Sequence, residues 1–92
     1  MRWTWDPVKN EANRLKHGLG FETAYLVFGD PFSVTLSDSY PGEGRWRTIG
    51  RVRSAVVIVI HAFPDGGEGV GRIISARKAT RNERKAYEEG EF

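Results

Sequence analysis

Four arginines occupy alternate positions of one predicted strand: Arg45, Arg47, Arg51 and Arg53. Side chains alternate between the two faces of an extended chain, so these guanidinium groups are expected on one face. Arginine stays charged at any working pH and holds phosphate through a planar fork of donors. The spacing therefore predicts a ridge that binds a polyanion, although a solvated, salt-bridged surface has the same pattern.

Two places in the sequence offer groups that could move a proton. Glu43 lies on the same predicted face as Arg45, where it could act as a base beside a phosphate clamp or only neutralise Arg45 across a turn. Lys16-His17-Gly18 ends a predicted helix, and histidine titrates near neutral pH. The alternative for Lys16 and His17 is that they bond the last carbonyls of that helix.

Arg72 and Arg77 lie in one predicted strand and are separated by five residues. On an ideal strand they project to opposite faces. They converge only if the strand bends, or if it ends before Arg77, which the cap at Thr80 permits. One of the two arginines is expected to be structural, as is His61, which follows the most apolar strand.

Chemistry that depends on a cofactor has no recognisable motif in the sequence. Two histidines are too few for a convincing metal site, and the carboxylates lack ligand spacing. Neither a P-loop nor a dinucleotide fingerprint is present. No cofactor is expected.

The first predicted helix, 7–17, begins with Asp6 as N-cap and Pro7 at the first position, and it stops at Gly18. Apolar residues at i, i+4 and i+7 predict its buried stripe, and polar residues at the same spacing predict a second, polar stripe. The apolar set is Val8, Ala12 and Leu15, and the polar set is Lys9, Asn13 and Lys16.

The remaining pattern predicts an α+β domain with a mostly antiparallel sheet, two N-terminal helices and one C-terminal helix, in the order β-α-α-β-β-β-β-α. The run 55–60 is apolar at every position and is expected to be the central strand. Thr80 and Glu83 form a capping box for a weakly held last helix. The expected strands are 2–5, 32–36, 45–53, 55–60 and 70–76, and the other helices are 21–28 and 81–89.

Length and composition fit one small cytoplasmic domain, residues 1–92. The absence of cysteine fits a reducing compartment, and there is neither a signal peptide nor an apolar run of about 18 residues. The net charge is only +2, yet ten arginines stand against four lysines and acids collect at the tail. This clustering favours a nucleic-acid surface more than the net charge does.

Taken in order, these segments resemble the BrnT family of toxins from bacterial type II toxin–antitoxin modules. The sequence departs from the family at Gly20, where serine is usual, and in a longer, more acidic loop after His61 that contains Asp65 and Glu68. The resemblance rests on Trp5-Asp6-Pro7, Lys9, Asn13, Lys16-His17-Gly18, Phe21, Ala24, Phe28, Asp30, Glu43, Arg45, Gly50, the run 72–80, Glu83 and Tyr87.

The resemblance implies a compact RelE-like fold and a ribonuclease that slows growth by cutting RNA. It also implies neutralisation by a BrnA-like antitoxin, which supplies the contact with DNA. The positions that carry over as catalytic candidates are Lys16, His17, Glu43, Arg45, Arg72 and Arg77.

Cleavage could then proceed without metal through the 2′-hydroxyl of RNA, which attacks its own phosphate. His17 or Glu43 would move protons, Lys16 and Arg45 would hold the phosphate, and Arg72 or Arg77 would stabilise the developing charge. The other arginines of the ridge are expected to bind RNA: Arg47, Arg51 and Arg53.

Two other functions fit the same residues. One is a nucleic-acid-binding module without catalysis, in which His17 is only a cap. The other is a co-repressor that acts through a DNA-binding partner, since the sequence has no clear helix-turn-helix of its own.

Overall fold

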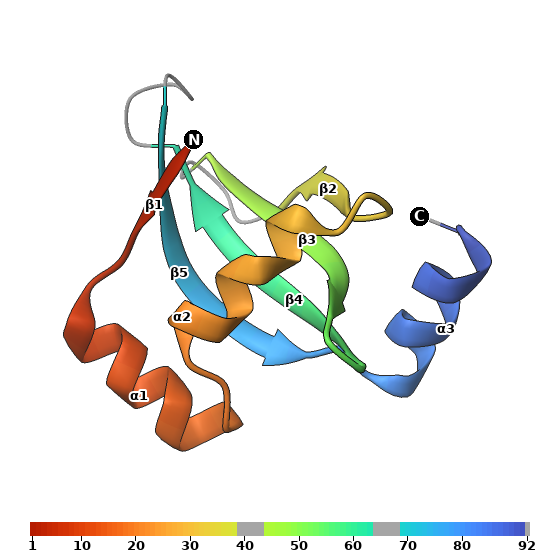
Figure 1. Ribbon diagram of the computed structural model, residues 1–92, viewed down its shortest axis with the longest axis horizontal. Coiled ribbons are helices and arrows are strands. Elements are labelled where there is room, and N and C mark those ends of the chain that lie inside the picture. Colours follow the sequence, from red (N-terminus) through yellow and green to blue (C-terminus); the bar gives the residue numbers. More distant parts are fainter. Residues whose placement is uncertain (39–43, 64–68, 92) are drawn as a thin grey trace.

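The computed structural model of the chain describes residues 1–38, 44–63 and 69–91. A five-stranded sheet in the order β1-β5-β4-β3-β2 forms its centre, with β1 parallel to β5 and every other pair antiparallel (Figure 1). The predicted α+β class and element order are confirmed, except that the helix expected at 21–28 is a short α-helix followed by a 3-10 helix, η1. The strands are β1 Arg2–Thr4, β2 Val34–Ser37, β3 Arg45–Val52, β4 Ala55–Ala62 and β5 Val70–Lys78, and the helices are α1 Pro7–His17, α2 Phe21–Ala24, η1 Tyr25–Gly29 and α3 Arg81–Glu89.

The main core lies on the face of the sheet that α2 and η1 cover, which is the front face in Figure 1. Phe21, Val59 and Ile73 are almost fully buried there. Trp3 stacks on Phe28 with 3.8 Å between ring centroids, and it lies directly over Gly71. A Cβ at position 71 would come within 2.2 Å of the Trp3 ring, so only glycine lets β1 and β5 pair here.

A buried polar side chain joins α1 to the sheet. β1 pairs with β5 only as far as Arg72, so the edge of β5 beyond that residue needs another partner. Asn13 supplies it: its Oδ1 accepts from the Ala76 amide at 3.1 Å, and its Nδ2 donates to the Ala76 carbonyl at 2.8 Å. A third bond, 2.9 Å long, runs from Nδ2 to the Leu19 carbonyl. Asn13 therefore takes the place of a neighbouring strand.

The predicted buried stripe of α1 is wrong. Val8 and Leu15 are 75% and 73% exposed, and Ala12 is exposed as well. The helix turns its Asn13 side inward because two backbone groups at the open edge of β5 require hydrogen bonds, and apolar side chains cannot make them.

The opposite face of the sheet carries a smaller core and the arginines. Arg45, Arg47 and Arg51 stand opposite Ala62, Ile60 and Val56 of β4, and all of them point to this face, together with Ile49 and Ile58. We call this side the arginine face. The prediction that β3 arginines share one face is confirmed for three of the four.

Arg53 does not belong to that row. It lies after β3, in the turn to β4, with φ 56°. A residue in the left-handed region ends the strand alternation, so the predicted position of Arg53 on the ridge is wrong.

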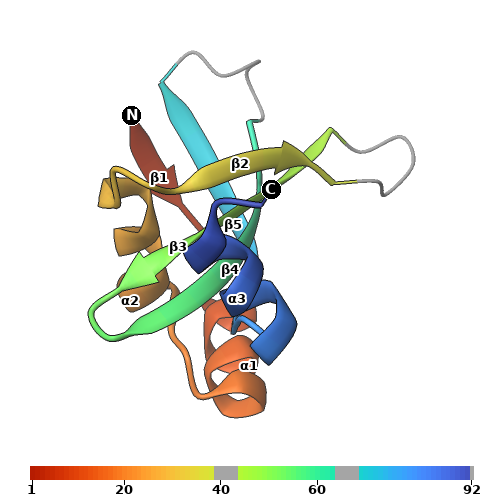
Figure 2. The same ribbon diagram turned by 90° about the vertical axis from the view of Figure 1, so that its right-hand side faces the viewer.

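Helix α3 packs over part of the arginine face (Figure 2), and Figure 1 shows that it lies apart from α1 and α2. None of its residues is fully buried, as the few apolar side chains predicted. Its capping box of Thr80 and Glu83 is present, and the Tyr87 hydroxyl donates to the Asp30 carboxylate. Within the described residues, no helix has the length and apolar character needed to cross a membrane.

Candidate functional site

An irregularity in β5 brings Arg72 and Arg77 to the same face of the sheet. Arg77 stands opposite Ile58, and Arg72 stands opposite Ala62, although the two arginines are five residues apart and their partners only four. The register shifts between Ile60 and His61, where β5 contains one extra residue, as in a β-bulge. The two arginines therefore converge, as the sequence allowed for a strand that bends, since a bulge changes the side-chain alternation without ending the strand.

The shift places Arg72 near Arg45. Both arginines are cross-strand neighbours of Ala62, one from β5 and one from β3, so about 10 Å separates their backbones. Arg72 is exposed and Arg45 is half-buried. Two arginine side chains that start this far apart can extend toward each other and hold a phosphate group between their forks.

The first turn of α1 completes a cleft at this point. Asp6 and Lys9 line it together with Arg45, Arg72, Ile73 and Ile74, and its volume is about 210 Å³. Asp6 is already engaged as the N-cap of α1, because its Oδ1 accepts a hydrogen bond from the Val8 amide at 2.8 Å. Among the described residues that line the cleft, three cations stand beside one carboxylate, an arrangement suited to an anion.

Lys9 was not predicted as a site residue. The available signal was its position four residues before Asn13, on the same stripe of α1. The stripe that brings Asn13 to β5 also brings Lys9 to the cleft beside Arg72.

Two other arginines of this face are tied to α3. Arg77 makes a two-pronged ion pair with Glu83, with Nη1–Oε1 2.7 Å and Nη2–Oε2 3.0 Å. The Arg77 guanidinium lowers the pKa of Glu83 to about 2. Arg51 lies 3.3 Å from the Glu88 carboxylate, with its guanidinium carbon 5.8 Å from the centre of the Tyr87 ring. Both residues thus help to anchor the last helix.

The remaining candidates lie away from the cleft. Lys16 and His17 end α1, which Gly18 closes with φ 67°, and about 10 Å of helix separates Lys16 from Lys9. Neither residue lines the cleft. Arg47 is half-buried, next to Arg45 on the arginine face.

One candidate, Glu43, falls outside the described residues. Asp65 and Glu68, which made the loop after His61 acidic in the sequence, fall outside them as well. In residues 1–38, 44–63 and 69–91, no group of three or more His, Asp or Glu side chains could hold a metal ion.

His61 is a core residue. It is 1% exposed, and its ring lies among Trp3, Phe28 and Phe63. Nε2 is 2.8 Å from the Thr48 hydroxyl, which in turn is hydrogen-bonded to Thr35. Burial lowers the pKa of His61 to about 4. These contacts agree with the predicted structural role.

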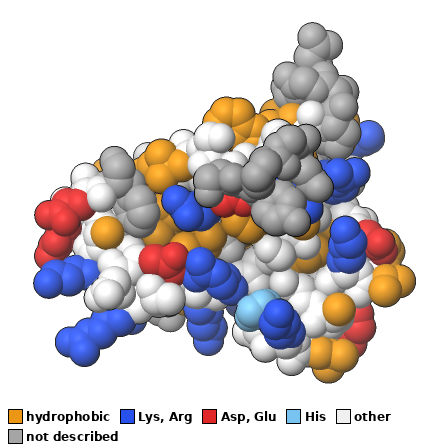
Figure 3. All heavy atoms as spheres, turned by 180° about the vertical axis from the view of Figure 1, so that it is seen from behind, with side chains coloured by type: hydrophobic (Ala, Val, Ile, Leu, Met, Phe, Trp, Pro, Cys, Tyr) orange, Lys and Arg blue, Asp and Glu red, His pale blue; other side chains and the backbone are white. Residues whose placement is uncertain are grey.

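Viewed from behind, the face that is turned away from α2 shows several separate Lys and Arg side chains, with Asp and Glu side chains among them (Figure 3). The family model described as "Ribonuclease toxin, BrnT, of type II toxin-antitoxin system" matches residues 5–83. The chain belongs to the BrnT toxin family. It is therefore an endoribonuclease toxin, with RNA as its substrate and an antitoxin as its partner.

A solved structure supports the same assignment. The BrnT chain is similar to the ribonuclease toxin BrnT of Brucella abortus, with a TM-score of 0.69 and 26% sequence identity. The alignment covers 88% of this chain and 99% of that one. Among curated proteins, no match to the chain was found.

Proposed function

We propose that this BrnT chain cuts RNA by internal attack of the 2′-hydroxyl, at a phosphate bound in the cleft between α1, β3 and β5. The observation that carries the proposal is the meeting of Lys9, Arg45 and Arg72, from three separate elements, around one cavity. Three donors around a phosphate match the charge that develops when a fifth oxygen approaches phosphorus.

The reaction then needs only proton transfers. A base removes the 2′-hydroxyl proton, the 2′-oxygen bonds to phosphorus, and the bond from phosphorus to the 5′-oxygen breaks. An acid returns a proton to that oxygen. The products are a 2′,3′-cyclic phosphate and a 5′-hydroxyl, so neither water nor metal enters the balance of this step.

Each side chain has a proposed role. Lys9 and Arg45 hold the non-bridging oxygens, and exposed Arg72 stabilises the developing charge. His17 and Glu43 remain the candidates for acid and base, with Lys16 beside His17. Arg77 supports this site through α3, because its guanidinium is already engaged by Glu83.

RNA on either side of the cleft is proposed to follow the arginine face. Arg47 is the next cation along β3 from Arg45 and carries the proposed path, because Arg51 is paired with Glu88 and Arg53 lies in the turn after β3. We also propose that the antitoxin is BrnA-like and that it alone contacts operator DNA. Covering the cleft is then enough to neutralise the toxin.

The test is purified chain with a labelled RNA in excess EDTA, followed by analysis of the product ends. The expected products carry a 2′,3′-cyclic phosphate, and the same oligonucleotide with 2′-O-methyl groups stays intact. A product with a 3′-hydroxyl, or cutting of the methylated strand, would contradict the proposed attack by the 2′-oxygen. RNA binding without any cleavage would favour the non-catalytic module.

A further inference from the structure

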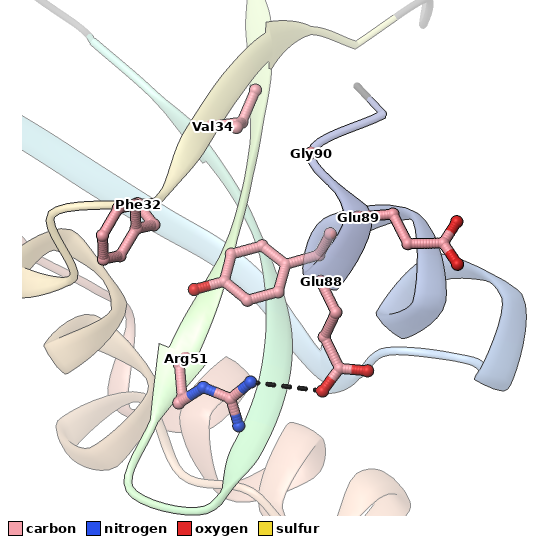
Figure 4. A pocket seen from close by; sticks show the side chains of 7 residues that line it. Phe32, Val34, Arg51, Glu88, Glu89 and Gly90 are labelled. Carbon is pink, nitrogen blue, oxygen red and sulfur yellow. Dashed lines mark hydrogen bonds and ion pairs between the residues drawn. The ribbon is translucent and has the colours of Figure 1, made fainter.

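A groove lies on the far side of the arginine face from the cleft, between β2, β3 and the end of α3. Phe32, Val34, Arg51 and Tyr87 line it, with Glu88, Glu89 and Gly90 at its rim, and its volume is about 700 Å³ (Figure 4). The apolar wall is accessible, since Phe32 is 77% exposed. A phenylalanine this exposed beside an open groove is a candidate contact for a partner.

The strand beside the groove has an open edge. β2 is the last strand of the sheet and pairs only with β3, so its other edge has no partner within the described residues. The Asp38 amide donates to the Arg45 carbonyl, which places that pair among the hydrogen-bonded positions of the ladder. Bonded positions alternate in an antiparallel pair, so the amides of Thr35 and Ser37 point outward to the open edge.

The edge and the groove fit one kind of occupant, an extended peptide. A segment that pairs with β2 turns every second side chain to the face on which Val34 lies, about 6–7 Å apart. One of these side chains can enter the groove between Phe32 and Tyr87. Main-chain bonds to the edge then give affinity, and the groove selects the side chain.

The charges at the rim indicate which peptide fits. Arg51 is paired with Glu88, so Glu89 leaves the rim negative, and exposed Glu91 follows just beyond Gly90. A negative rim repels the RNA backbone and also a second copy of this same rim. It attracts a segment in which lysine or arginine flanks the apolar residue.

We infer that the antitoxin adds an extended segment to the open edge of β2, placing an apolar side chain in the groove and a basic one at Glu89. This inference rests on the toxin–antitoxin function above and specifies where the partner binds. The contact leaves Lys9 and Arg72 untouched, so it anchors the antitoxin while other parts of the antitoxin reach the cleft.

The test measures the dissociation constant of the complex with the antitoxin encoded beside this chain, by titration calorimetry. Phe32→Ala removes the groove wall, and Ser37→Pro removes one outward amide without touching the β2–β3 ladder. Each is expected to weaken binding about 10-fold or more, as loss of an interface anchor does. Glu89→Lys is expected to weaken it as well, with the larger effect at low salt.

The matched control is Leu15→Ala on α1, an equally exposed apolar residue far from the groove. It should leave the affinity unchanged. If Leu15→Ala weakens the complex and Phe32→Ala does not, α1 is the interface and the inference fails. Far-UV circular dichroism of each variant, together with its melting temperature, separates a lost contact from a lost fold.

Three further results would overturn the inference. One is that the original chain, without any substitution, cuts RNA but does not bind the antitoxin. Another is that Phe32→Ala lowers the affinity for RNA but leaves the affinity for the antitoxin unchanged. The groove would then be an RNA-binding site. The third is a free dimer, seen by sedimentation, that Ser37→Pro dissociates. If instead the binding losses appear and cleavage is absent, the docking surface stands and only the proposed chemistry fails.

Discussion

The neighbours of each guanidinium group divide the arginines of the sheet by role. Arg72 faces the cleft, whereas Arg77 holds Glu83 with both of its terminal nitrogens. The two residues were equivalent candidates in the sequence, because either could stabilise the charge on phosphorus. Their contacts make Arg72 the proposed catalytic cation and Arg77 the anchor of α3.

Arg72→Ala is expected to lower the rate of RNA cleavage about 100- to 1,000-fold, as removal of one donor to a developing negative charge typically does. Arg72 is exposed, so the free energy of unfolding should change by less than about 0.5 kcal/mol. Single-turnover cleavage of a short RNA measures the rate, and urea unfolding measures the stability.

The control for this change is Arg84→Ala, which removes an exposed arginine from α3, away from the cleft. It should cleave at the original rate. Full activity of folded Arg72→Ala would remove this residue from the proposed mechanism.

His61 makes the stability of the fold depend on pH. Burial lowers its pKa from the ordinary 6.5 to about 4, so the folded chain resists a proton that the unfolded chain accepts. Above pH 6.5 the neutral His61 side chain makes its full contribution to the free energy of unfolding. As the pH falls from 6.5 toward 4, this contribution is lost, by at most about 1.4 kcal/mol per pH unit. Urea unfolding between pH 7 and pH 4.5 measures this slope.

His61→Gln is the comparison, because glutamine can still bond Thr48 but cannot take up the proton. Its stability should fall less steeply over the same interval. Equal slopes for the two chains would show that other groups cause the loss.

At the scale of residues, the sequence was sufficient where a motif acts locally. The caps at Asp6, Gly18 and Thr80 depend on neighbours a few positions away, and all three are confirmed. Lys9 could not be selected in this way, since its role depends on Arg45 and Arg72, which are distant in sequence and adjacent only in the folded sheet.

Among the elements, α1 shows how tertiary contacts override a helical pattern. Its apolar residues predicted the wrong side because the open edge of β5 selects a side chain that can both donate and accept. Amphipathicity describes the average behaviour of surface helices and contains no information about an unpaired strand edge.

Asn13→Ala is therefore expected to cost about 2–4 kcal/mol of unfolding free energy, because it leaves two backbone groups of Ala76 unpaired in a buried place. Leu15→Ala should cost less than about 0.5 kcal/mol, since its side chain is 73% exposed. Urea denaturation of both variants gives the two values. If Leu15→Ala costs more than Asn13→Ala, the apolar side of α1 is the buried side, as its sequence pattern predicted.

The sequence predicted the strands more accurately than the helices. Continuous apolar residues identified β4 as the central strand, and it lies third in the five-stranded order. The bulge in β5 escaped prediction because Ile73 and Ile74 are both compatible with an ordinary strand, and only the pairing with β4 shows which of them is extra.

At the scale of the whole molecule, the two faces of the sheet carry different kinds of side chain. Aromatic and apolar side chains fill the face under α2 and η1, while the other face holds a smaller core and five arginines of β3 and β5: Arg45, Arg47, Arg51, Arg72 and Arg77. This separation lets the arginines change without disturbing the main core. It also places five of the ten arginines on one face of the sheet in a chain whose net charge is only +2.

RNA binding should accordingly weaken steeply as salt rises. Each phosphate contact with single-stranded RNA contributes about −0.7 to the slope of log affinity against log salt concentration. Arg47→Ala is expected to make the slope shallower by about this amount, and Arg14→Ala, on the outer side of α1, should not change it. Fluorescence anisotropy with 2′-O-methyl RNA, which cannot be cleaved, measures the salt dependence of both variants. An unchanged slope in Arg47→Ala would exclude this residue from the RNA path.

The extra residue of β5 means that the length of this strand, as well as its composition, sets where Arg72 points. Deleting Ile74 is expected to keep Arg72 and Ile73 on their present faces, because Ser75, Ile73 and Arg72 already pair with three consecutive residues of β4. A pairing that instead kept Ile74 in the ladder would turn Arg72 toward the aromatic core and Ile73 toward the arginine face. In a bacterium, an in-frame loss of the codon for Ile74 is therefore expected to preserve the cleft, whereas a slip of β5 by one residue would remove a cation from it without altering any charge.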